Sequence, residues 1–464
     1  MTGLLFTFVY VGYLLIMGIG LRIMSFTLIG YTIHSRRLSG LLAHGFFIGL
    51  FAHVTLLNCL QLLNLSNATN GFIIATIAIG FALIIGIYHF RGLTLIHKSN
   101  DRKQQLIIFM LIVTASLFIF YNSHNVPNLA WDTWTVWIAR AKQWYYHGLS
   151  SDFVQPEHWL TQSTVLLNLS SHYPDGLSLI IYPIVAFNET IKPALLGLYI
   201  TAYGFLVLLM SNRLEKLAAP FIIRLFLLLV MYSTPLLINH ILLPGYADIW
   251  LACYIMLIML VLLDYNDQPN RGLRLTLIAY ALMLPMLKLE GWAWLLIFFF
   301  SHTIIMWFGL KQRVIILVAL LATFALWLLL GGISLNTPWG PFNITPTEIN
   351  LFNKAYLSFT YTQVSEAIIN GLFWQFNWSL LWFGLPFLVA YMVMKKHSKA
   401  LQVSHLFFII AFITFLVLFY LTPAAKYALD FTAVNRILLQ LMPCYIFLLF
   451  TLLSSLFNTK KPMV

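Results

Sequence analysis

Side chains capable of proton transfer or ion binding are concentrated in four short motifs, each at the end of a hydrophobic segment. The motifs are Trp131-Asp132, His172-Tyr173-Pro174-Asp175, Gly245-Tyr246-Ala247-Asp248 and Lys288-Leu289-Glu290-Gly291. Carboxylates and histidine can accept or donate protons, and an ammonium group can bind a phosphate. Because charged groups at the edge of hydrocarbon are costly to hold, these motifs indicate chemistry or ion handling at one rim of a bilayer.

Asp132 lies between Trp131 and Trp134, at the start of a segment whose apolar residues recur at helical spacing. One interpretation is structural, because an aspartate at the first turn of a helix at 132–148 would satisfy exposed amides. The other is chemical, because a carboxylate there could deprotonate a hydroxyl or bind a metal. The residue types alone leave both interpretations open.

The other three motifs allow the same two interpretations. His172 and Asp175 offer two proton-handling groups, although Pro174 between them is also typical of a turn with interfacial aromatics. Asp248 follows Pro-Gly and could cap a helix. Lys288 and Glu290 interrupt a long apolar stretch, which is consistent with a tight hairpin and a snorkelling lysine or with a phosphate-binding site.

Arg436 precedes the last hydrophobic segment, close to Lys426, Tyr427 and Asp430. Its guanidinium could provide a second contact for a phosphate. Anchoring at the membrane interface is the alternative. The three cysteines, Cys59, Cys253 and Cys444, are spaced too far apart for a metal site or a disulfide framework, and we expect them to be small core residues inside hydrophobic segments.

The composition indicates an all-α polytopic membrane protein. The chain has 464 residues, of which 61% are hydrophobic and 9% are charged, and its mean hydropathy is +0.87. We expect about 13 transmembrane helices, near residues 4–22, 41–63, 71–90, 105–121, 194–211, 221–240, 246–264, 273–287, 291–309, 314–332, 371–394, 402–421 and 438–457. The net charge of +12 is then explained by orienting loops, so no nucleic-acid partner is expected.

The distribution of Lys and Arg predicts the orientation. Of the 26 basic residues, all but seven fall in every second loop, the exceptions being Arg140, Lys142, Lys192, Lys288, Lys354, Lys426 and Arg436. This alternation places the N-terminus outside and the C-terminus in the cytoplasm. Of the 14 acidic residues, only Asp101, Glu215, Asp264 and Asp267 then face inward, so the four motifs share the outer face.

The same alternation leaves two long outer loops, at residues 122–193 and 333–370. The first contains the predicted helix at 132–148, whose stripe of Trp134, Trp137, Ala141, Trp144 and Tyr145 suits the membrane interface, with Arg140 and Lys142 on other faces. The second is rich in Pro, Asn and Thr and is typical of a lid or a surface excursion. Residues 1–104 carry almost no polar chemistry on the outer face and are predicted to be a three-span N-terminal add-on to residues 105–464.

These motifs together resemble the GT-C superfamily of integral-membrane glycosyltransferases, which includes protein O-mannosyltransferases and bacterial aminoarabinose transferases of lipid A. The similar features are Trp131-Asp132-Thr133-Trp134 after a span, a long outer loop with an interfacial helix, His172-Tyr173-Pro174, Gly245-Tyr246-Ala247-Asp248 and Lys288-Leu289-Glu290-Gly291. The resemblance covers roughly residues 105–457. The first loop carries Asp132 alone where the mannosyltransferases have paired acidic residues.

The resemblance implies an enzyme that moves a sugar, with inversion, from a polyprenyl-phosphate donor to an extracytoplasmic acceptor such as a cell-envelope glycan, lipid or protein. It implies a bacterial inner membrane, and it leaves a divalent cation open as cofactor without assigning metal ligands. Asp132 would be the general base, with Asp248 as a second catalytic carboxylate, and Lys288 and Arg436 would neutralise the leaving phosphate. The remaining substrate contacts would be Trp131, Trp134, His172, Tyr173, Asp175, Tyr246 and Glu290.

Two other classes of protein fit the same residues. A transporter or flippase for lipid-linked or anionic solutes would use Lys288, Glu290 and Asp248 as binding and coupling groups inside the membrane. A non-enzymatic membrane assembly subunit would use the motifs only as helix caps. The lack of an inverted repeat and of polar groups on the inner side argues against the transporter, because alternating access needs both gates.

Overall fold

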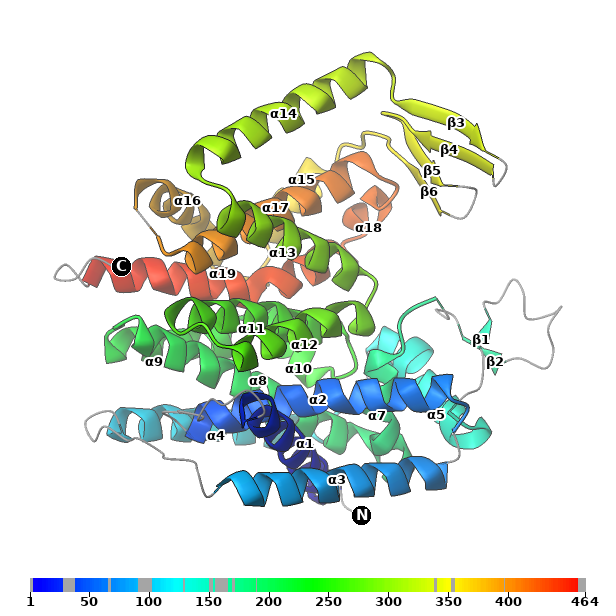
Figure 1. Cartoon of the computed structure of the whole chain (residues 1–464), viewed down its shortest axis with the longest axis vertical. Helices are drawn as coiled ribbons and strands as arrows, with labels where there is room; N and C mark the ends of the chain where they lie inside the picture. The colour runs from blue at the N-terminus through cyan, green and yellow to red at the C-terminus, as the bar shows by residue number, and fades with distance from the viewer. Residues whose placement is uncertain are drawn as a thin grey trace. The chain divides into compact units, whose positions relative to one another are not determined.

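The computed structural model describes residues 3–27, 38–65, 68–90, 102–127, 130–149, 153–154, 166–168, 172–188, 190–337, 340–351, 355–395 and 397–457. Contacts divide the chain into two compact units: Met1–Leu295 with Met442–Val464, and Leu296–Leu441. Two helices, α13 (Glu290–Trp307) and α19 (Val434–Phe457), carry the chain from one unit to the other (Figure 1). The predicted division at residue 104 does not coincide with either boundary.

Helices dominate the first unit. In chain order they are α1 (Gly3–Thr27), α2 (Leu38–Leu62), α3 (Ala68–Phe90), α4 (Arg102–Ser123), the π-helical turn η2 (Thr133–Trp137), α5 (Ile138–His147), α7 (Gly176–Phe187), α8 (Ile191–Lys216), α9 (Phe221–Ser233), α10 (Pro235–Leu242), α11 (Asp248–Asp267) and α12 (Arg271–Leu287). A short parallel pair, β1 (Phe153–Val154) and β2 (Leu166–Leu167), lies between α5 and α7 along the chain.

The prediction of a helical polytopic membrane protein is confirmed in outline. Within the described ranges, nine helices are long and apolar enough to cross a membrane, or ten if α9 and α10, which meet at a 58° bend, form one broken span. The bend falls at Pro235, which cannot donate the backbone hydrogen bond that would continue α9. The structure therefore shows a multi-pass arrangement of apolar helices.

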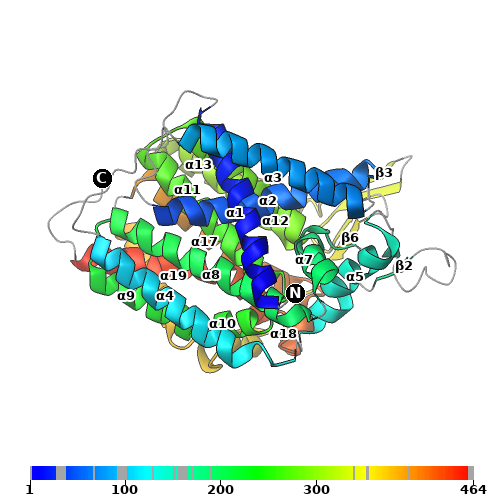
Figure 2. The ribbon, with the colours of Figure 1, turned by 90° about the horizontal axis from the view of Figure 1, so that it is seen from below.

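The first two helices are integral to the first unit. Helix α1 contacts α2, α3 and α8, and Figure 2 shows it crossing them. A methyl group on Gly18 of α1 would lie 1.7 Å from the carbonyl oxygen of Gly45 in α2, so the two backbones touch through glycine, as in many membrane helix pairs. In addition, Tyr254 of α11 donates a hydrogen bond to the carbonyl of Phe47, at 2.9 Å.

Two groups of charges mark the two ends of α11. Asp248 is its first residue and pairs with Lys288, whereas Asp264 and Asp267 in its last turn both pair with Arg213 of α8, at 2.8 and 2.6 Å. The residues between are buried and apolar. Because a helix rises about 1.5 Å per residue, Asp264 and Asp267 lie roughly 24 and 29 Å along the axis from Asp248, close to the thickness of a bilayer core.

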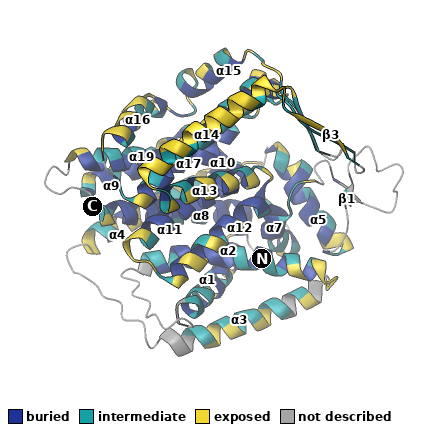
Figure 3. Ribbon diagram, turned by 45° about the horizontal axis from the view of Figure 1, so that its top comes forward, coloured by how far each residue is buried: buried dark blue, intermediate teal, exposed yellow. Residues whose placement is uncertain are grey.

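The second unit contains α14 (Leu310–Leu329), a four-stranded sheet, and a series of helical segments. The segments are α15 (Ser365–Ile369), η3 (Asn370–Trp374), η4 (Leu381–Gly384), α16 (Leu385–Met394), α17 (Lys399–Leu421) and α18 (Ala425–Leu429). Figure 3 shows α14 exposed along its length, and none of its residues is buried. An apolar helix with this exposure suits a lipid environment.

The second predicted outer loop forms a sheet that the sequence did not predict. Strands β3 (Ile333–Thr337), β4 (Gly340–Ile344), β5 (Glu348–Leu351) and β6 (Ala355–Ser358) pair in this order, all antiparallel. Gly332, at φ +90°, starts the first strand at a point where a side chain would meet the carbonyl of Ile344. The Pro, Asn and Thr residues that suggested an irregular loop lie in strands as well as in the turns that join them.

Candidate functional site

The centre of the candidate site is a buried ion triad, made of Asp248, Lys288 and Glu290. The Lys288 ammonium lies 2.9 Å from a carboxylate oxygen of Asp248 and 2.8 Å from one of Glu290. The side chain of Asp248 is 0% exposed and that of Lys288 6%, whereas that of Glu290 is 30% exposed. The triad has two carboxylates and one ammonium group, so it has an excess of one negative charge. Only the side chain of Glu290 can turn toward water.

Chain geometry explains why Lys288 and Glu290 point to the same place. Lys288 follows the last residue of α12 and has extended backbone, and Glu290 begins α13. The turn is tight because Gly291 has no side chain: a methyl group there would lie 2.0 Å from the carbonyl oxygen of Leu284. The predicted hairpin is therefore present, but Lys288 is buried against carboxylates and does not snorkel to the surface.

The loop before Asp248 lies directly against the Asp132 motif. The Thr133 hydroxyl donates to the carbonyl of Pro244 at 3.2 Å. Gly245 has φ +119°, and a side chain there would lie 2.1 Å from the Thr133 hydroxyl oxygen, so only glycine fits both the conformation and the space. Asp132, the neighbour of Thr133, is half-buried and precedes the π-helical turn η2 without capping it through its side chain.

A second ion pair joins α5 to the His172–Asp175 motif. Arg140, completely buried in α5, donates from one guanidinium nitrogen to the carbonyl of Tyr173 at 2.8 Å and to Asp175 at 2.5 Å. Burial raises the pKa of Asp175 above its ordinary range, although the positive charge of Arg140 opposes this effect. Asp175 thus combines a fixed position with partial access to solvent, its side chain being 36% exposed.

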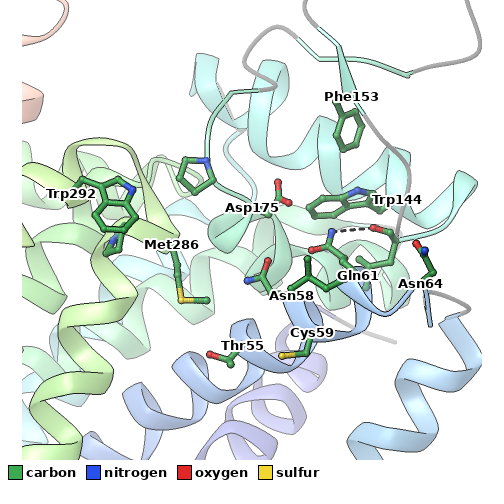
Figure 4. Close-up of a pocket in the computed structure, with 14 residues that line it drawn as sticks. Thr55, Asn58, Cys59, Gln61, Asn64, Trp144, Phe153, Asp175, Met286 and Trp292 are labelled. Carbon is green, nitrogen blue, oxygen red and sulfur yellow. Dashed lines mark hydrogen bonds between the residues drawn. The ribbon is translucent and has the colours of Figure 1, made fainter. Parts of the chain in front are cut away.

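A close contact between Gly176 and the end of α12 completes the site. Gly176, directly after Asp175, packs so closely on the end of α12 that a methyl group would lie 2.2 Å from the carbonyl oxygen of Met286. The four predicted motifs are therefore joined through η2 and α5, by contacts within one compact unit. Next to this junction lies a cavity of about 860 Å³, whose lining residues include Asp175, Pro285, Met286 and Trp292 (Figure 4).

Other predicted site residues lie around this junction or in the other unit. Tyr246 offers its carbonyl to the hydroxyl of Tyr199 at 3.0 Å, and its ring lies 5.1 Å from that of His240. Tyr173 packs between Trp137 and His172, with ring centroids 5.5 and 4.8 Å away.

The two tryptophans that flank Asp132, together with Arg436, complete the placement of the predicted residues. Trp131 and Trp134 are 70% and 47% exposed. Lys142 lies over the ring of Trp134, with 5.4 Å between its ammonium and the ring centroid. Arg436 belongs to the first turn of α19, in the part of that helix assigned to the second unit.

Two predictions about individual residues are wrong. Arg140 was expected on a face other than the stripe of Trp134, Trp137, Ala141, Trp144 and Tyr145, yet it is 0% exposed, since its spacing from Trp137 and Trp144 puts it on their buried side. Cys59 was expected in the core, yet it is exposed and lines the cavity. In both cases the spacing along the helix could have indicated the true environment.

Polar residues of α2 were also missed. Thr55, Asn58, Gln61 and Asn64 all line the cavity, from a segment that was predicted to carry almost no polar chemistry. The signal was present in the sequence, because Thr55, Asn58 and Gln61 recur at every third position of α2 and so lie on neighbouring parts of one side, while Asn64 follows the end of the helix. Their composition, in a chain of apolar spans, should have identified α2 as part of a site.

Within the described ranges, no three His, Cys, Asp or Glu side chains are grouped as a metal site would require. The carboxylates of Asp175, Asp248 and Glu290 are each paired with an arginine or a lysine of the protein, and no step is assigned to a metal. Comparison of the chain with protein-family models, with curated proteins and with solved structures gave no match. The geometry of the site must therefore support any functional conclusion by itself.

Proposed function

We propose that the protein is a membrane glycosyltransferase of the GT-C type, which moves a sugar from a polyprenyl-phosphate donor to an extracytoplasmic acceptor in the cell envelope. The observation that carries the proposal is the direct linkage of all four motifs within one unit. Thr133 contacts Pro244 and Gly245, Arg140 holds Asp175, Gly176 packs on the residue pair before Lys288, and Lys288 binds Asp248. Unconnected helix caps would not require these contacts.

The donor phosphate is assigned to Lys288. As it stands, the triad has excess negative charge and would repel an anion, so one carboxylate must leave before a phosphate can bind. Glu290 is the exchangeable partner because its side chain is 30% exposed, whereas Asp248 is fully buried and remains to orient the ammonium. A phosphate that replaces Glu290 would gain a charge-assisted hydrogen bond from Lys288.

Asp132 is assigned as the general base. In an inverting transfer the acceptor hydroxyl oxygen attacks the anomeric carbon, its proton passes to a carboxylate, and the bond from that carbon to the phosphate oxygen breaks. The polyprenyl phosphate leaves with the bonding electrons, and Lys288 offsets the charge that develops on it. Asp132 suits the first task because it is half-buried and its carboxylate is not used to cap η2.

The test is transfer by the purified full chain, with a polyprenyl-phosphate sugar as donor and membrane extract as acceptor. Asp132→Asn retains the shape of the side chain and removes its basicity, and we expect a loss of about 10²–10⁴-fold in transfer with donor binding unchanged. Lys288→Ala should weaken donor binding, and Lys288→Arg should restore part of it. Transfer by Asp132→Asn at the parental rate would remove this residue from the mechanism, and Asp248 or Asp175 would replace it.

Glu290→Gln provides the sharper test of the exchange. If Glu290 competes with phosphate for Lys288, removing its charge should tighten donor binding, whereas Lys288→Ala loosens it. A direct role of Glu290 in holding the donor gives the opposite result, weaker binding in Glu290→Gln. Transport of a lipid-linked solute across vesicles without any sugar transfer would instead favour the transporter.

We further propose that all 13 predicted spans cross a bacterial inner membrane, with the N-terminus outside and the C-terminus in the cytoplasm. The charge alternation of the loops supports this orientation, and the position of Asp248 and Asp264 at opposite ends of the apolar helix α11 supports a membrane-spanning α11. Alkaline phosphatase and green fluorescent protein fused after Lys142 and at the C-terminus test it. A fluorescent fusion after Lys142 would overturn the orientation and the extracytoplasmic site with it.

A further inference from the structure

One wall of the cavity is formed by α2, a helix that lies outside the region resembling glycosyltransferases. Four polar side chains, Thr55, Asn58, Gln61 and Asn64, line the cavity at every third position from the middle of α2 to the residues after its end. The amide of Gln61 donates to the carbonyl of Leu149 at 3.0 Å, and that of Asn58 to Val54 at 3.0 Å. These bonds fix both amides and leave their oxygens as acceptors.

The facing walls are aromatic. Figure 4 shows Trp144 and Phe153 on one side of Asp175 and Trp292 across the cavity, with Asn58 and Gln61 reaching up from α2. Trp292 is 55% exposed. The indole nitrogen of Trp144 is buried and has no hydrogen-bond partner among the described residues, which is costly for a donor in the absence of a ligand.

The charged and polar groups that line the cavity indicate which class of ligand it can bind. Asp175 is its charged lining residue, and no lysine or arginine is among the residues that line it in the described part of the chain. Arg140 already offsets the charge of Asp175, so the cavity wall offers no excess positive charge that would attract phosphate or another anion. Amide oxygens, a carboxylate and an indole N–H are partners for hydroxyl groups, and tryptophan faces pack on the apolar C–H face of a sugar ring.

We propose that this cavity is a binding site for an uncharged saccharide, and that α2 of the N-terminal segment forms its specificity-determining wall. Because neither Asp132 nor Lys288 lines the cavity, the saccharide is the part of a sugar acceptor that lies away from its reacting hydroxyl group. The role of the saccharide as an acceptor rests on the proposed function, whereas the saccharide site itself is argued from the lining residues alone. A volume of about 860 Å³ falls within the range of ligand pockets of about 300–1,000 Å³. Asp175 accepts a sugar hydroxyl here, with Arg140 holding it in place.

The chain contains its own reporter for this site. Cys59 lines the cavity and is exposed, whereas Cys253 and Cys444 are buried. Modification of the purified full chain with N-ethylmaleimide, followed by intact mass, therefore measures access to the cavity, and Cys59→Ser confirms the site of modification. The probes are methyl glycosides of glucose, galactose, mannose and arabinose, compared with inorganic phosphate and decaprenyl phosphate.

We expect at least one methyl glycoside to slow modification of Cys59 in a saturable manner. Asn58→Ala should raise the half-protecting concentration by about two- to tenfold, the effect of one neutral hydrogen-bond partner. Trp292→Ala should raise the half-protecting concentration at least as much as Asn58→Ala does. The matched control is Asn122→Ala on α4, because Asn122 also donates to the carbonyl four residues before it, at 2.7 Å, but lines no part of the cavity.

Three results would overturn the proposal: no protection by any glycoside, protection by phosphate or decaprenyl phosphate alone, or equal effects of Asn58→Ala and Asn122→Ala. Decaprenyl phosphate acting alone would make the cavity the donor site and would leave the proposed function intact. Conversely, glycoside protection in a chain that transfers no sugar would keep the saccharide site and refute the transferase.

Discussion

Replacing Lys288 by methionine removes the cation of a fully desolvated ion pair. The ammonium lies 2.9 Å from Asp248, and the two side chains are 6% and 0% exposed. At an effective dielectric constant near 20 the attraction is about 6 kcal/mol, most of which offsets the cost of burying both charges. Once Lys288 is gone, Asp248 has lost the partner that compensated its burial, and we expect a loss of about 3–5 kcal/mol in the free energy of unfolding.

The double variant Asp248→Asn with Lys288→Met should recover most of this loss, because no uncompensated charge remains buried. We expect the free energy of unfolding of this double variant to lie within about 1 kcal/mol of that of the parent. Glu290 contributes little to the change in the free energy of unfolding of either variant, since its side chain is 30% exposed and can turn to water. The measurement is reversible unfolding of the full chain in mixed micelles, followed by tryptophan fluorescence.

Lys216→Met is the matched control for this cycle. Lys216 pairs with Asp264 at 2.6 Å, but its side chain is 44% exposed, so its removal should cost no more than about 1 kcal/mol. A Lys288→Met variant as stable as Lys216→Met would refute the reasoning, because the triad could not then be desolvated. A double variant as unstable as Lys288→Met alone would show that the loss comes from packing rather than from charge.

Further predictions concern the contacts around the triad and the cavity. Gly245→Ala should destabilise the site and abolish transfer, because φ of +119° and a distance of 2.1 Å to the Thr133 hydroxyl oxygen both exclude a side chain. Combining Gly245→Ala with Thr133→Gly removes the close contact, including the Thr133 Cβ at 2.7 Å, but not the backbone strain. Thermal unfolding should therefore show partial recovery in this double variant. Since burial raises the pKa of Asp175, its ionised form is lost at a higher pH than for an ordinary aspartate. Glycoside binding followed by saturation-transfer NMR should therefore fall on acidification above the usual aspartate range, and Asp175→Asn should abolish this pH dependence. Arg140→Met should weaken glycoside binding, because methionine has no donor to hold the Tyr173 carbonyl and the Asp175 carboxylate in place.

The sequence alone determined the class of protein and the places where chemistry could occur. Apolar segments long enough to span a bilayer predict membrane helices because hydrocarbon leaves no other partner for backbone polar groups. The same argument makes any charge beside such a segment conspicuous, which is why Lys288, Glu290 and Asp248 could be singled out without coordinates. The alternation of basic loops likewise depends on local composition and can be followed directly along the chain.

Only the tertiary structure decided which of these residues meet. Lys288 and Asp248 are 40 residues apart in sequence, and their pairing depends on how α11 and α12 pack, which no local pattern encodes. Arg140 shows the limit clearly: helical spacing places it on the stripe of Trp137 and Trp144, but its partner Asp175 lies 35 residues away and is decided by packing. The polar side chains of α2 can likewise be found in the sequence, but they line a cavity only because other elements close the space in front of them.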